Sequence, residues 1–509
     1  MTSSTPTETP EIPAATATAP EDRIPLTQKI AYGLGSCHDM WGHWLYPNVA
    51  LMVFNIYLGV PIALVTTALT FNRIFDAVSD PVFGRLSDNT RTRYGRRRPY
   101  ILFGGVLAGI GLPILFFVTP GWSNMAYFWF ILVSSAVFIP VMSSFNMAYQ
   151  SLGTEMTPDY NERTRLYASK VAIQKLPELM NYLTPQFTTL AVWVGATHRN
   201  LPKRLWLLLT SGAAWRNPAA GQKPNVLLGA QVGFAVLGAV MVIAAILAFL
   251  LLRERYYGQV VARNQAKISL KDTIVGALKC RPFRLLLLMI VTFALGQSMV
   301  GLFSLYETIY YVCGGNLAAG NGWNSGMGLG NMVFGILGLP LFAYLGRRIG
   351  KRHALAAALI FSIFMYVSTW WLYNPRHPWL LPLTWGLVGM GAAGIWMLFQ
   401  SILADVMDYD ELETGLRREG AFNACTSWLV KAAIAAGTAG SGFIISLIGF
   451  DARLGGAQAP HAIFLMRLLL PAVPVVGLSL AVFFVLKLPL THERMAEIRR
   501  LLEARRGRV

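Results

Sequence analysis

Ionisable side chains lie inside long apolar segments of this sequence, where each must face protein or water and have a partner. Asp76 and Asp80 are four residues apart, so on a helix their carboxylates share one face. These like charges repel unless a cation lies between them, and either Na⁺ or a shared proton would serve. Arg73 could instead neutralise one Asp in a structural pair, and Lys431 could be their counter-ion or compete with the cation. The pair therefore predicts a cation site, with a structural cluster as the alternative.

Asp39 and Trp396 are side chains that could bind a polar ligand. A carboxylate accepts two hydroxyl hydrogen bonds, and an aromatic face covers the C–H side of a sugar ring. The depth of a residue in the bilayer can be counted at about 1.5 Å per residue from the cytoplasmic end of its apolar segment. Six groups then lie at depths of about 12–18 Å: Asp39, Asn146, Asp76, Asp80, Lys431 and Trp396. Transporters hold substrate at this level of the bilayer. The chemistry alone does not choose a sugar over another polar solute.

The composition of the chain requires an apolar solvent. Of 509 residues, 54% are hydrophobic and 13% are charged, whereas soluble domains carry roughly 25% charged residues. The net charge is +18, but the basic residues lie in short segments between apolar runs. That pattern is typical of cytoplasmic loops and argues against nucleic acid as a partner. The four cysteines are widely separated and show no metal-ligand or redox spacing.

Apolar runs long enough to cross a bilayer as helices recur along the chain. We predict about twelve, near 30–58, 62–87, 100–119, 125–153, 167–194, 226–252, 284–313, 323–346, 353–374, 379–406, 419–448 and 464–487. They divide the chain into a disordered tail (1–27), a six-helix bundle (28–252), a connecting loop (253–283), a second six-helix bundle (284–490) and a basic tail (491–509). The fold class predicted is an all-α membrane protein.

The basic loops predict that both termini are cytoplasmic. The connection between the second and third spans is rich in arginine, whereas several connections on the opposite side hold no Lys or Arg. The segment 195–225 is basic, yet the order of the spans places it on the side of the membrane opposite the cytoplasm. Its RLWLLLTSGAAW stretch could form a short helix at the membrane interface. RYGRR at 93–97 reappears as RIGKR at 348–352, a spacing of 255 between the two glycines, which suggests two related halves about a central cavity.

Other charges lie toward the ends of spans. Lys170, Lys175 and Glu178, near the inner end of the fifth span, could form gating ion pairs or be interfacial charges. Glu307 lies near the outer end of its span, where its side chain can extend to the interface. Asp405 and Asp408 fall where the tenth span meets the cytoplasm, as expected of an inner gate.

Three motifs resemble one known family. They are RIFDAVSDPVFGRLSDNTRTRYGRRRPYIL, AYQSLGTEMTPDYNERTRL and FQSILADVMDYDELETGLRREGAFNACTSWLVKAA. In this order they closely resemble the glycoside, pentoside and hexuronide cation symporters of the major facilitator superfamily, and GRRRP also resembles the loop of plant sucrose transporters. The resemblance implies the major facilitator fold of two six-helix bundles, with no cofactor besides the coupling ion.

The melibiose permease-like pattern implies roles residue by residue. It places Asp76, Asp80, Ser79 and Ser143 at the cation, with Asp76 and Asp80 as metal ligands only if the ion is Na⁺. Substrate binding is assigned to Asp39, Asn146, Gln150, Trp396, Lys431 and Ser427. Cytoplasmic gating is assigned to Arg73, Asp88, Arg96, Arg97, Arg163, Asp405 and Asp408.

The chain departs from that pattern at four positions. Asn146 stands where the pattern has an Asp, and Gln150 where it has a Trp, so the particular sugar is open. Ser79 replaces a cation-ligating Asn, which leaves H⁺ as well as Na⁺ open, and His38 replaces a Lys.

The sequence thus predicts a monomeric sugar or glycoside symporter of the cell membrane, driven by H⁺ or Na⁺ through alternating access. Two alternatives are a lipid or amphipathic-solute transporter of the same fold and a non-transporting sugar sensor. An enzyme is not expected, because the sequence shows no nucleophile–base pair, metal cluster or phosphate loop.

Overall fold

A computed structural model provides the structure of the chain. It describes residues 23–90, 92–156, 160–219, 221–254, 278–414 and 419–490, with a few positions between 494 and 501. The predicted tail up to residue 22 and most of the connecting loop, residues 255–277, lie outside the described residues. So do the side chains of Asp88 and Arg163, two residues predicted to act in gating.

The described chain is helical, and no strand occurs in it, as the sequence predicted. The first span is a succession of short helices: α1 (Leu26–Leu34), α2 (Ser36–Asp39), η2 (Met40–Leu45), α3 (Tyr46–Ala50) and η3 (Leu51–Tyr57). The other spans of the first half are α4 (Ile62–Asn89), α5 (Arg98–Ile114), α6 (Asn124–Glu155), α7 (Tyr160–Thr188) and α9 (Val226–Leu251). The second half has α11 (Arg281–Tyr306) continued by η8 (Glu307–Val312), α12 (Leu317–Ile349), α13 (Lys351–Leu372), α14 (Leu380–Thr414), α15 (Glu419–Leu447) and α16 (Pro460–Leu486).

These helices coincide with the twelve predicted spans. Nine of the described helices are long and apolar enough to cross a membrane. α5 is apolar but has only 17 residues. The first span is divided by two π-helical segments, and α7 carries Lys170, Lys175 and Glu178, so neither meets the same criterion of length and composition.

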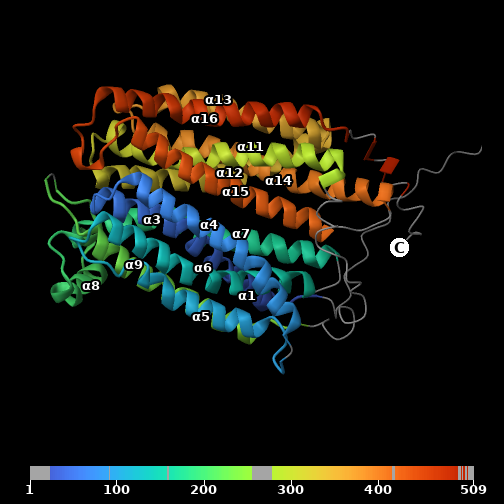
Figure 1. Cartoon of the computed structure of the whole chain (residues 1–509), viewed down its shortest axis with the longest axis horizontal. Coiled ribbons are helices and arrows are strands. Elements are labelled where there is room, and N and C mark those ends of the chain that lie inside the picture. The colour runs from blue at the N-terminus through green and yellow to red at the C-terminus, as the bar shows by residue number, and fades with distance from the viewer. Residues whose placement is uncertain are drawn as a thin grey trace, which may run out of the picture.

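The two halves repeat the same helices at the spacing that the sequence predicted. α11 begins 255 residues after α1, at Arg281 against Leu26, and α12 begins 255 residues after α4, at Leu317 against Ile62. The first-half helices lie together on one side of the molecule and the second-half helices on the other (Figure 1). The halves meet where α4 packs on α15 and α7 packs on α12.

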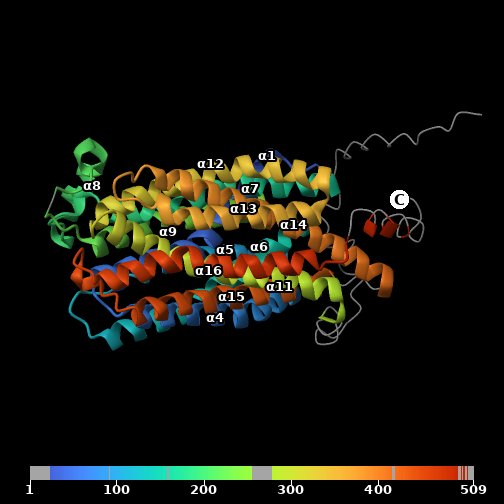
Figure 2. The same cartoon turned by 90° about the horizontal axis from the view of Figure 1, so that it is seen from above.

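The molecule has two distinct ends (Figures 1 and 2). The short helix α8 (Leu201–Thr210) and the other connections on its side form one end, here the α8 end. The loop that carries RYGRRRP joins α4 to α5 at the opposite end, which we term the basic end. α8 is the helix expected in the RLWLLLTSGAAW stretch, and its Trp206 and Leu209 are exposed.

Candidate functional site

The predicted cation-site residues lie where the two halves meet. Asp76 and Asp80 are on α4, and Lys431 is on α15 of the other half. The Nζ of Lys431 lies 2.8 Å from Oδ2 of Asp76 and also pairs with Asp80. Asp76 is almost fully buried. Lys431 is therefore the ion-pair partner of both carboxylates, and this contact joins the two bundles.

Two serines that were predicted to bind the cation, Ser79 and Ser143, lie close to Asp76. The hydroxyl of Ser143 on α6 donates to Oδ1 of Asp76 at 3.3 Å. The hydroxyls of Ser79 and Ser143 lie 2.7 Å apart. A hydrogen bond to the ionised form of a carboxylate stabilises that form. Ser143 and Lys431 therefore both contact the buried Asp76 carboxylate, and Ser79 is linked to it through Ser143.

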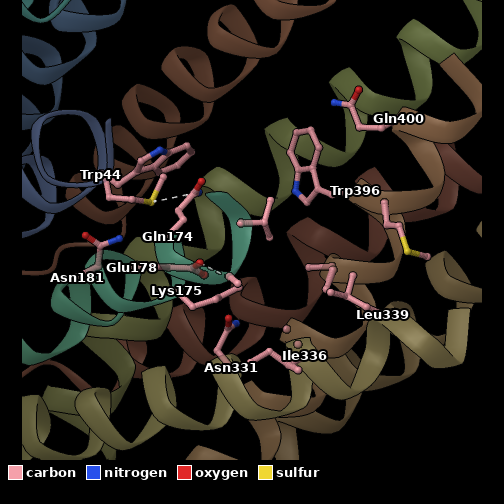
Figure 3. Close-up of a pocket in the computed structure, with 18 of the residues that line it drawn as sticks. Trp44, Gln174, Lys175, Glu178, Asn181, Asn331, Ile336, Leu339, Trp396 and Gln400 are labelled. Atoms are coloured by element: carbon pink, nitrogen blue, oxygen red, sulfur yellow. Dashed lines mark hydrogen bonds and ion pairs between the residues drawn. The ribbon is translucent and has the colours of Figure 1, made fainter. Parts of the chain in front are cut away.

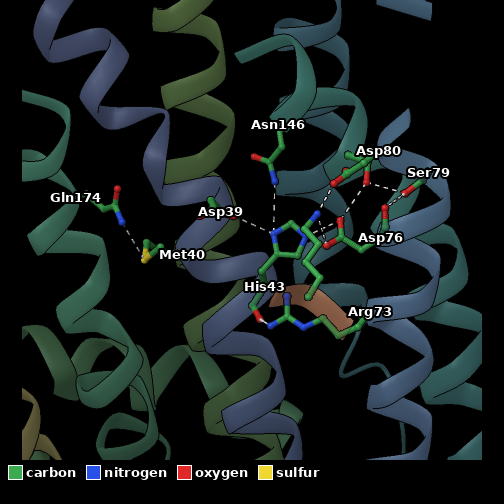
Figure 4. A network of polar contacts seen from close by, with 11 residues as sticks. Asp39, Met40, His43, Arg73, Asp76, Ser79, Asp80, Asn146 and Gln174 are labelled. Atoms are coloured by element: carbon green, nitrogen blue, oxygen red, sulfur yellow. Dashed lines mark hydrogen bonds and ion pairs between the residues drawn. The ribbon is translucent and has the colours of Figure 1, made fainter. Parts of the chain in front are cut away.

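His43 stands at the centre of this cluster, and the sequence analysis missed it. Its Nδ1 lies 3.2 Å from Oδ1 of Asp39, and its Nε2 lies 3.3 Å from Oδ1 of Asp76 (Figure 4). Nδ2 of Asn146 lies 3.4 Å from the same Nδ1. His43 thereby connects the predicted substrate residues Asp39 and Asn146 to the predicted cation site. Its position four residues after Asp39, on the same helical face, was the signal that could have revealed it.

The local backbone brings His43 to this position. Residues Met40–Leu45 form a π-helix directly after Asp39, a form that often occurs at functional sites. Neighbouring side chains fix the segment, since the Trp41 indole N–H donates to the carbonyl of Pro177 on α7 at 3.0 Å. Arg73 donates to the carbonyl of His43 at 2.8 Å, and its guanidinium lies over the ring of Trp44. Arg73 therefore holds the first span against α4, while Lys431 pairs with the acidic residues.

A cavity of about 1410 Å³ is lined by residues of both halves, among them Trp44, the residue after His43 (Figure 3). Its walls come from the first span, α7, α11, α12 and α14. Trp396, the aromatic residue predicted to bind the substrate, lines it. The sequence analysis did not predict five amide side chains that also line it: Gln174, Asn181, Gln297, Asn331 and Gln400. The cavity therefore combines a large aromatic face with amides that can donate and accept hydrogen bonds.

The cavity reaches from the middle of the molecule toward the basic end. Tyr167, near the basic end of α7, and Gln400, in the basic half of α14, line it. At the α8 end the halves contact each other directly. The Tyr306 hydroxyl donates to Asn55, and the Ser325 hydroxyl donates to the carbonyl of Tyr182 at 2.8 Å. The structure therefore has its α8 end closed.

Two of the predicted gating residues, Asp405 and Arg97, make a contact within their own half. Lys351, from the second copy of the repeated motif, lies 2.7 Å from Asp405. Arg97 donates to the hydroxyl of Ser87 at 3.2 Å. Asp408 is half-buried on α14.

Glu254, which the sequence analysis did not single out, holds the RYGRRRP loop. Its carboxylate accepts hydrogen bonds from the backbone amides of Arg96, Arg97 and Arg98 at 2.8–3.1 Å. These bonds fasten the loop to the end of α9.

Three further positions differ from the cluster in their surroundings. Of the six residues predicted to bind substrate, Trp396 lines the cavity, whereas Asp39, Asn146, Gln150, Ser427 and Lys431 are not among its lining residues. Gln150 and Ser427 are exposed. Glu307, near the outer end of its span, is buried and does not extend to the interface. Its side chain is 1% exposed and lies 3.9 Å from the guanidinium of Arg467, which faces it from α16. A buried acidic group paired in this way stays inside the protein.

Comparisons with known proteins agree with this arrangement. Residues 31–492 match the family model "MFS/sugar transport protein". The chain is 25% identical to the glucuronide carrier protein homolog of Escherichia coli, covering 92% of this chain and 93% of that protein. It is 22% identical to the isoprimeverose transporter of Lactiplantibacillus pentosus, covering 91% and 88%.

Solved structures show the same fold. A bacterial homolog of the human lysosomal transporter Spinster, in an inward-facing unoccupied conformation, matches with a TM-score of 0.63 over 94% of this chain and 97% of that chain, at 13% identity. A variant of the fucose:proton symporter of Escherichia coli matches with a TM-score of 0.51 over 91% and 98%, also at 13% identity.

Proposed function

Because the chain belongs to the MFS/sugar transport protein family, we propose that it is a secondary active symporter that imports a sugar or glycoside with H⁺ or Na⁺. One observation carries the coupling: Lys431 of one half pairs with Asp76 and Asp80 of the other. A cation that binds this acidic pair must change the contact between the halves. Occupancy of the site and the arrangement of the bundles are therefore linked.

The substrate lies in the cavity beside the acidic cluster. Asp39 accepts hydrogen bonds from its hydroxyl groups, and Trp396 packs against the C–H face of its ring. Asn146 and Lys431 extend the polar side of the site. Gln150 and Ser427, exposed in this structure, contact the substrate only if they turn inward in another state.

Alternating access follows from the contacts between the halves. The α8 end is closed by Tyr306, Asn55, Ser325 and Tyr182, while the cavity extends toward the basic end. The basic loops place that end in the cytoplasm, so this state opens inward. Opening to the outside breaks the α8-end contacts and brings the basic ends of the helices together. The predicted gate residues Arg96, Arg97, Asp405 and Asp408 then contact each other across the halves.

The protein works as a monomer in the cell membrane with both termini in the cytoplasm. One chain contains both halves of the pathway, and no cofactor is needed besides the coupling ion. The amide and charged groups of the cavity favour a polar solute over a lipid, since a lipid tail would leave Gln297, Asn331 and Gln400 without hydrogen-bond partners.

Uptake into liposomes tests this proposal. The purified protein is reconstituted, a pH gradient or a Na⁺ gradient is imposed separately, and uptake of a labelled glucuronide, isoprimeverose and lactose is followed. The relatives named above and a matched lactose permease of Leuconostoc lactis suggest these probes. We expect one gradient to drive accumulation of at least one probe. Binding without uptake under either gradient would contradict symport and favour a sensor.

A further inference from the structure

We propose that one face of α7 forms a second substrate subsite, and that the cavity therefore binds a neutral glycoside of two rings. The face consists of Gln174, Lys175, Glu178 and Asn181, and we term it the α7 polar face. This inference rests on the proposed symporter function and narrows its substrate class. It gives these four side chains a role in substrate binding that the family pattern does not assign to them.

The α7 polar face is a continuous stripe on one wall of the cavity. Its residues follow one another at intervals of one, three and three positions, which places them on one side of the helix. All four line the cavity, and Trp396 lines it from α14 of the other half (Figure 3). At a rise of about 1.5 Å per residue the stripe is roughly 10 Å long, which exceeds the width of one pyranose ring. It therefore offers contacts to more of a substrate than a single ring.

A charged pair stands at the centre of the stripe. The Nζ of Lys175 lies 2.7 Å from Oε2 of Glu178, and the two side chains are 26% and 29% exposed. An ion pair three residues apart contributes little to the stability of a helix, whereas charged groups at this level of a membrane protein are costly and mark substrate pathways. The pair presents an ammonium donor and a carboxylate acceptor, and both form strong hydrogen bonds with hydroxyl groups.

The two amides of the stripe are poorly satisfied by the protein. The Nε2 of Gln174 donates to the sulfur of Met40 at 3.7 Å, and a thioether is a weak acceptor. The Oδ1 of Asn181 is buried and has no hydrogen-bond partner among the described residues. A buried acceptor without a partner is costly. A sugar hydroxyl at this position supplies the missing donor.

The size and the aromatic residues of the cavity indicate two rings. Its volume of about 1410 Å³ exceeds the roughly 300–1,000 Å³ that is typical of pockets for drug-sized molecules. Trp44 and Trp396 line it from the two halves, and the Trp44 side chain is 42% exposed. Each indole can cover the C–H face of one ring. One ring at Trp396 and a second between Trp44 and the α7 polar face would use both walls.

The charges of the cavity wall favour a neutral substrate. Among the described residues that line the cavity, only Lys175 and Glu178 are charged, and their charges cancel. A carboxylate on the substrate would find no unpaired cation in this wall and would be repelled by Glu178. Uncharged hydroxyl groups can instead use both members of the pair.

Basic side chains of the neighbouring acidic cluster are engaged with other partners. Lys431 pairs with both carboxylates of the predicted cation site. Lys170 lies over two tyrosine rings and interacts electrostatically with Asp39. Arg73 donates to a backbone carbonyl of the first span, and His43 lies between two carboxylates. A carboxylate-bearing substrate would have to compete with these partners, whereas a neutral one does not.

The first test compares affinities of the purified wild type by titration. The probes are lactose and isoprimeverose, their single-ring components galactose and xylose, and the matched pair para-nitrophenyl glucoside and para-nitrophenyl glucuronide. We expect at least one neutral two-ring probe to bind, and its single-ring component to bind roughly tenfold or more weaker because it cannot reach the charged pair as well as Trp396. The glucuronide, which has a carboxylate in place of a CH₂OH group, should bind about fivefold or more weaker than the glucoside.

The second test changes the charged pair and follows the ratio of the glucuronide Kd to the glucoside Kd. Glu178→Gln leaves Lys175 unpaired, so the ratio should fall about tenfold. Lys175→Gln leaves Glu178 unpaired and should raise the ratio. The double variant Lys175→Gln, Glu178→Gln makes the wall neutral again, so its ratio should return to within about twofold of the wild type. Its affinity for the neutral two-ring probe should stay lowered, because amides bind hydroxyl groups less strongly than charged groups do.

Glu162→Gln is the matched control. Glu162 lies on the same helix and forms an ion pair of the same length, 2.7 Å, with Lys29. It is not among the residues that line the cavity, so the ratio should equal that of the wild type. The unfolding temperature of each variant is measured first, so that a loss of fold is recognised.

The outcomes separate this inference from the symporter proposal. If both single variants keep the wild-type ratio, or if the wild type prefers the glucuronide or the single rings, the subsite is overturned while gradient-driven uptake still supports symport. Failure of every neutral two-ring probe to bind would also overturn the subsite. If the affinities follow the expected pattern but neither gradient drives accumulation, the symporter proposal fails and the subsite stands as that of a sensor.

Discussion

The two halves of this molecule repeat the same helices but differ in the chemistry that those helices carry. The first half places four ionisable groups together: Asp39, His43, Asp76 and Asp80. The positions 255 residues later are occupied by uncharged residues: Ala294, Ser298, Asn331 and Gly335. The duplicated helices thus supply one scaffold, and the ionisable cluster belongs to one copy of it. Lys431 is the residue by which the second half reaches that cluster.

The second half instead contributes much of the cavity wall. Asn331 and Gly335 of α12 line the cavity, together with Trp396 and Gln400 of α14. Asn331 and Gly335 stand on α12 where α4 has Asp76 and Asp80. These neutral side chains leave space in the cavity and place no unpaired charge in its wall. We propose that coupling is concentrated in the first half, whereas the second half mainly shapes the substrate site.

The largest expected effect is the loss of coupling in Asp76→Asn. The amide cannot hold a proton or cation as the carboxylate does, and it leaves Lys431 with Asp80 alone. We expect the accumulation ratio of the sugar in liposomes to fall to about one. Asp451→Asn, in the connection between α15 and α16, serves as control and should accumulate normally. Accumulation above one-tenth of the wild-type level in Asp76→Asn would remove this carboxylate from the coupling site.

A carboxylate at the equivalent position of the second half should not restore coupling. The double variant Asp76→Asn, Asn331→Asp moves the charge to α12, away from its partners His43 and Lys431. We expect accumulation to stay absent in the same liposome assay. Restored accumulation would show that the two halves are interchangeable and that coupling does not depend on which half carries the carboxylate.

Removal of the Trp396 indole should weaken sugar binding but leave the coupling of sugar uptake to the cation intact. Trp396→Ala loses the face that covers the sugar ring, so its Kd should rise about tenfold, equivalent to roughly 1.4 kcal/mol. Trp396→Phe keeps an aromatic face and should change the Kd by less. Titration of the purified protein gives both values. An unchanged Kd in Trp396→Ala would place the sugar elsewhere.

The smallest effect concerns an ion pair in the first half at the basic end. Glu162, in the first turn of α7, lies 2.7 Å from Lys29 and accepts a hydrogen bond from the amide of Ile24. Burial alone raises the pKa of Glu162, but these two partners outweigh it and lower the pKa below its ordinary value. The stabilisation is therefore present at neutral pH and is lost as pH falls below roughly 4.3 toward the lowered pKa.

Glu162→Gln should lower the unfolding temperature at neutral pH by no more than a few degrees, because one such hydrogen-bonded pair contributes about 1 kcal/mol. The difference from the wild type should shrink in acid. Thermal unfolding in detergent at the two pH values measures it. A difference that grows in acid would contradict the lowered pKa.

The sequence predicted the features that depend on local pattern. Apolar runs marked the spans, and the four-residue spacing of Asp76 and Asp80 placed them on one face. The repeated RYGRR and RIGKR motifs gave the offset between the halves, which the helix starts reproduce. Each of these signals lies within one helix or one loop.

Features that depend on contacts between helices could not be predicted in the same way. The four-residue spacing of His43 from Asp39 could be read from the sequence, but its contact with Asp76 depends on α4 lying beside the first span. Glu307 is buried because Arg467, 160 residues later, faces it from α16. Asp405 meets Lys351 because α13 and α14 pack together. Sequence spacing carries no information about such partners.

The most direct test asks whether Asp76 serves coupling alone and not the substrate site. It compares two sugar fluxes in liposomes that contain the Asp76→Asn variant. One flux is accumulation against a gradient, which needs coupling. The other is exchange of labelled for unlabelled sugar at equal concentrations, which needs only the substrate site and the rocking of the bundles. We predict that exchange stays within about threefold of the wild type while accumulation is lost, since only coupling energy is removed. Loss of both fluxes together with loss of sugar binding would contradict the account, because Asp76 would then belong to the substrate site itself.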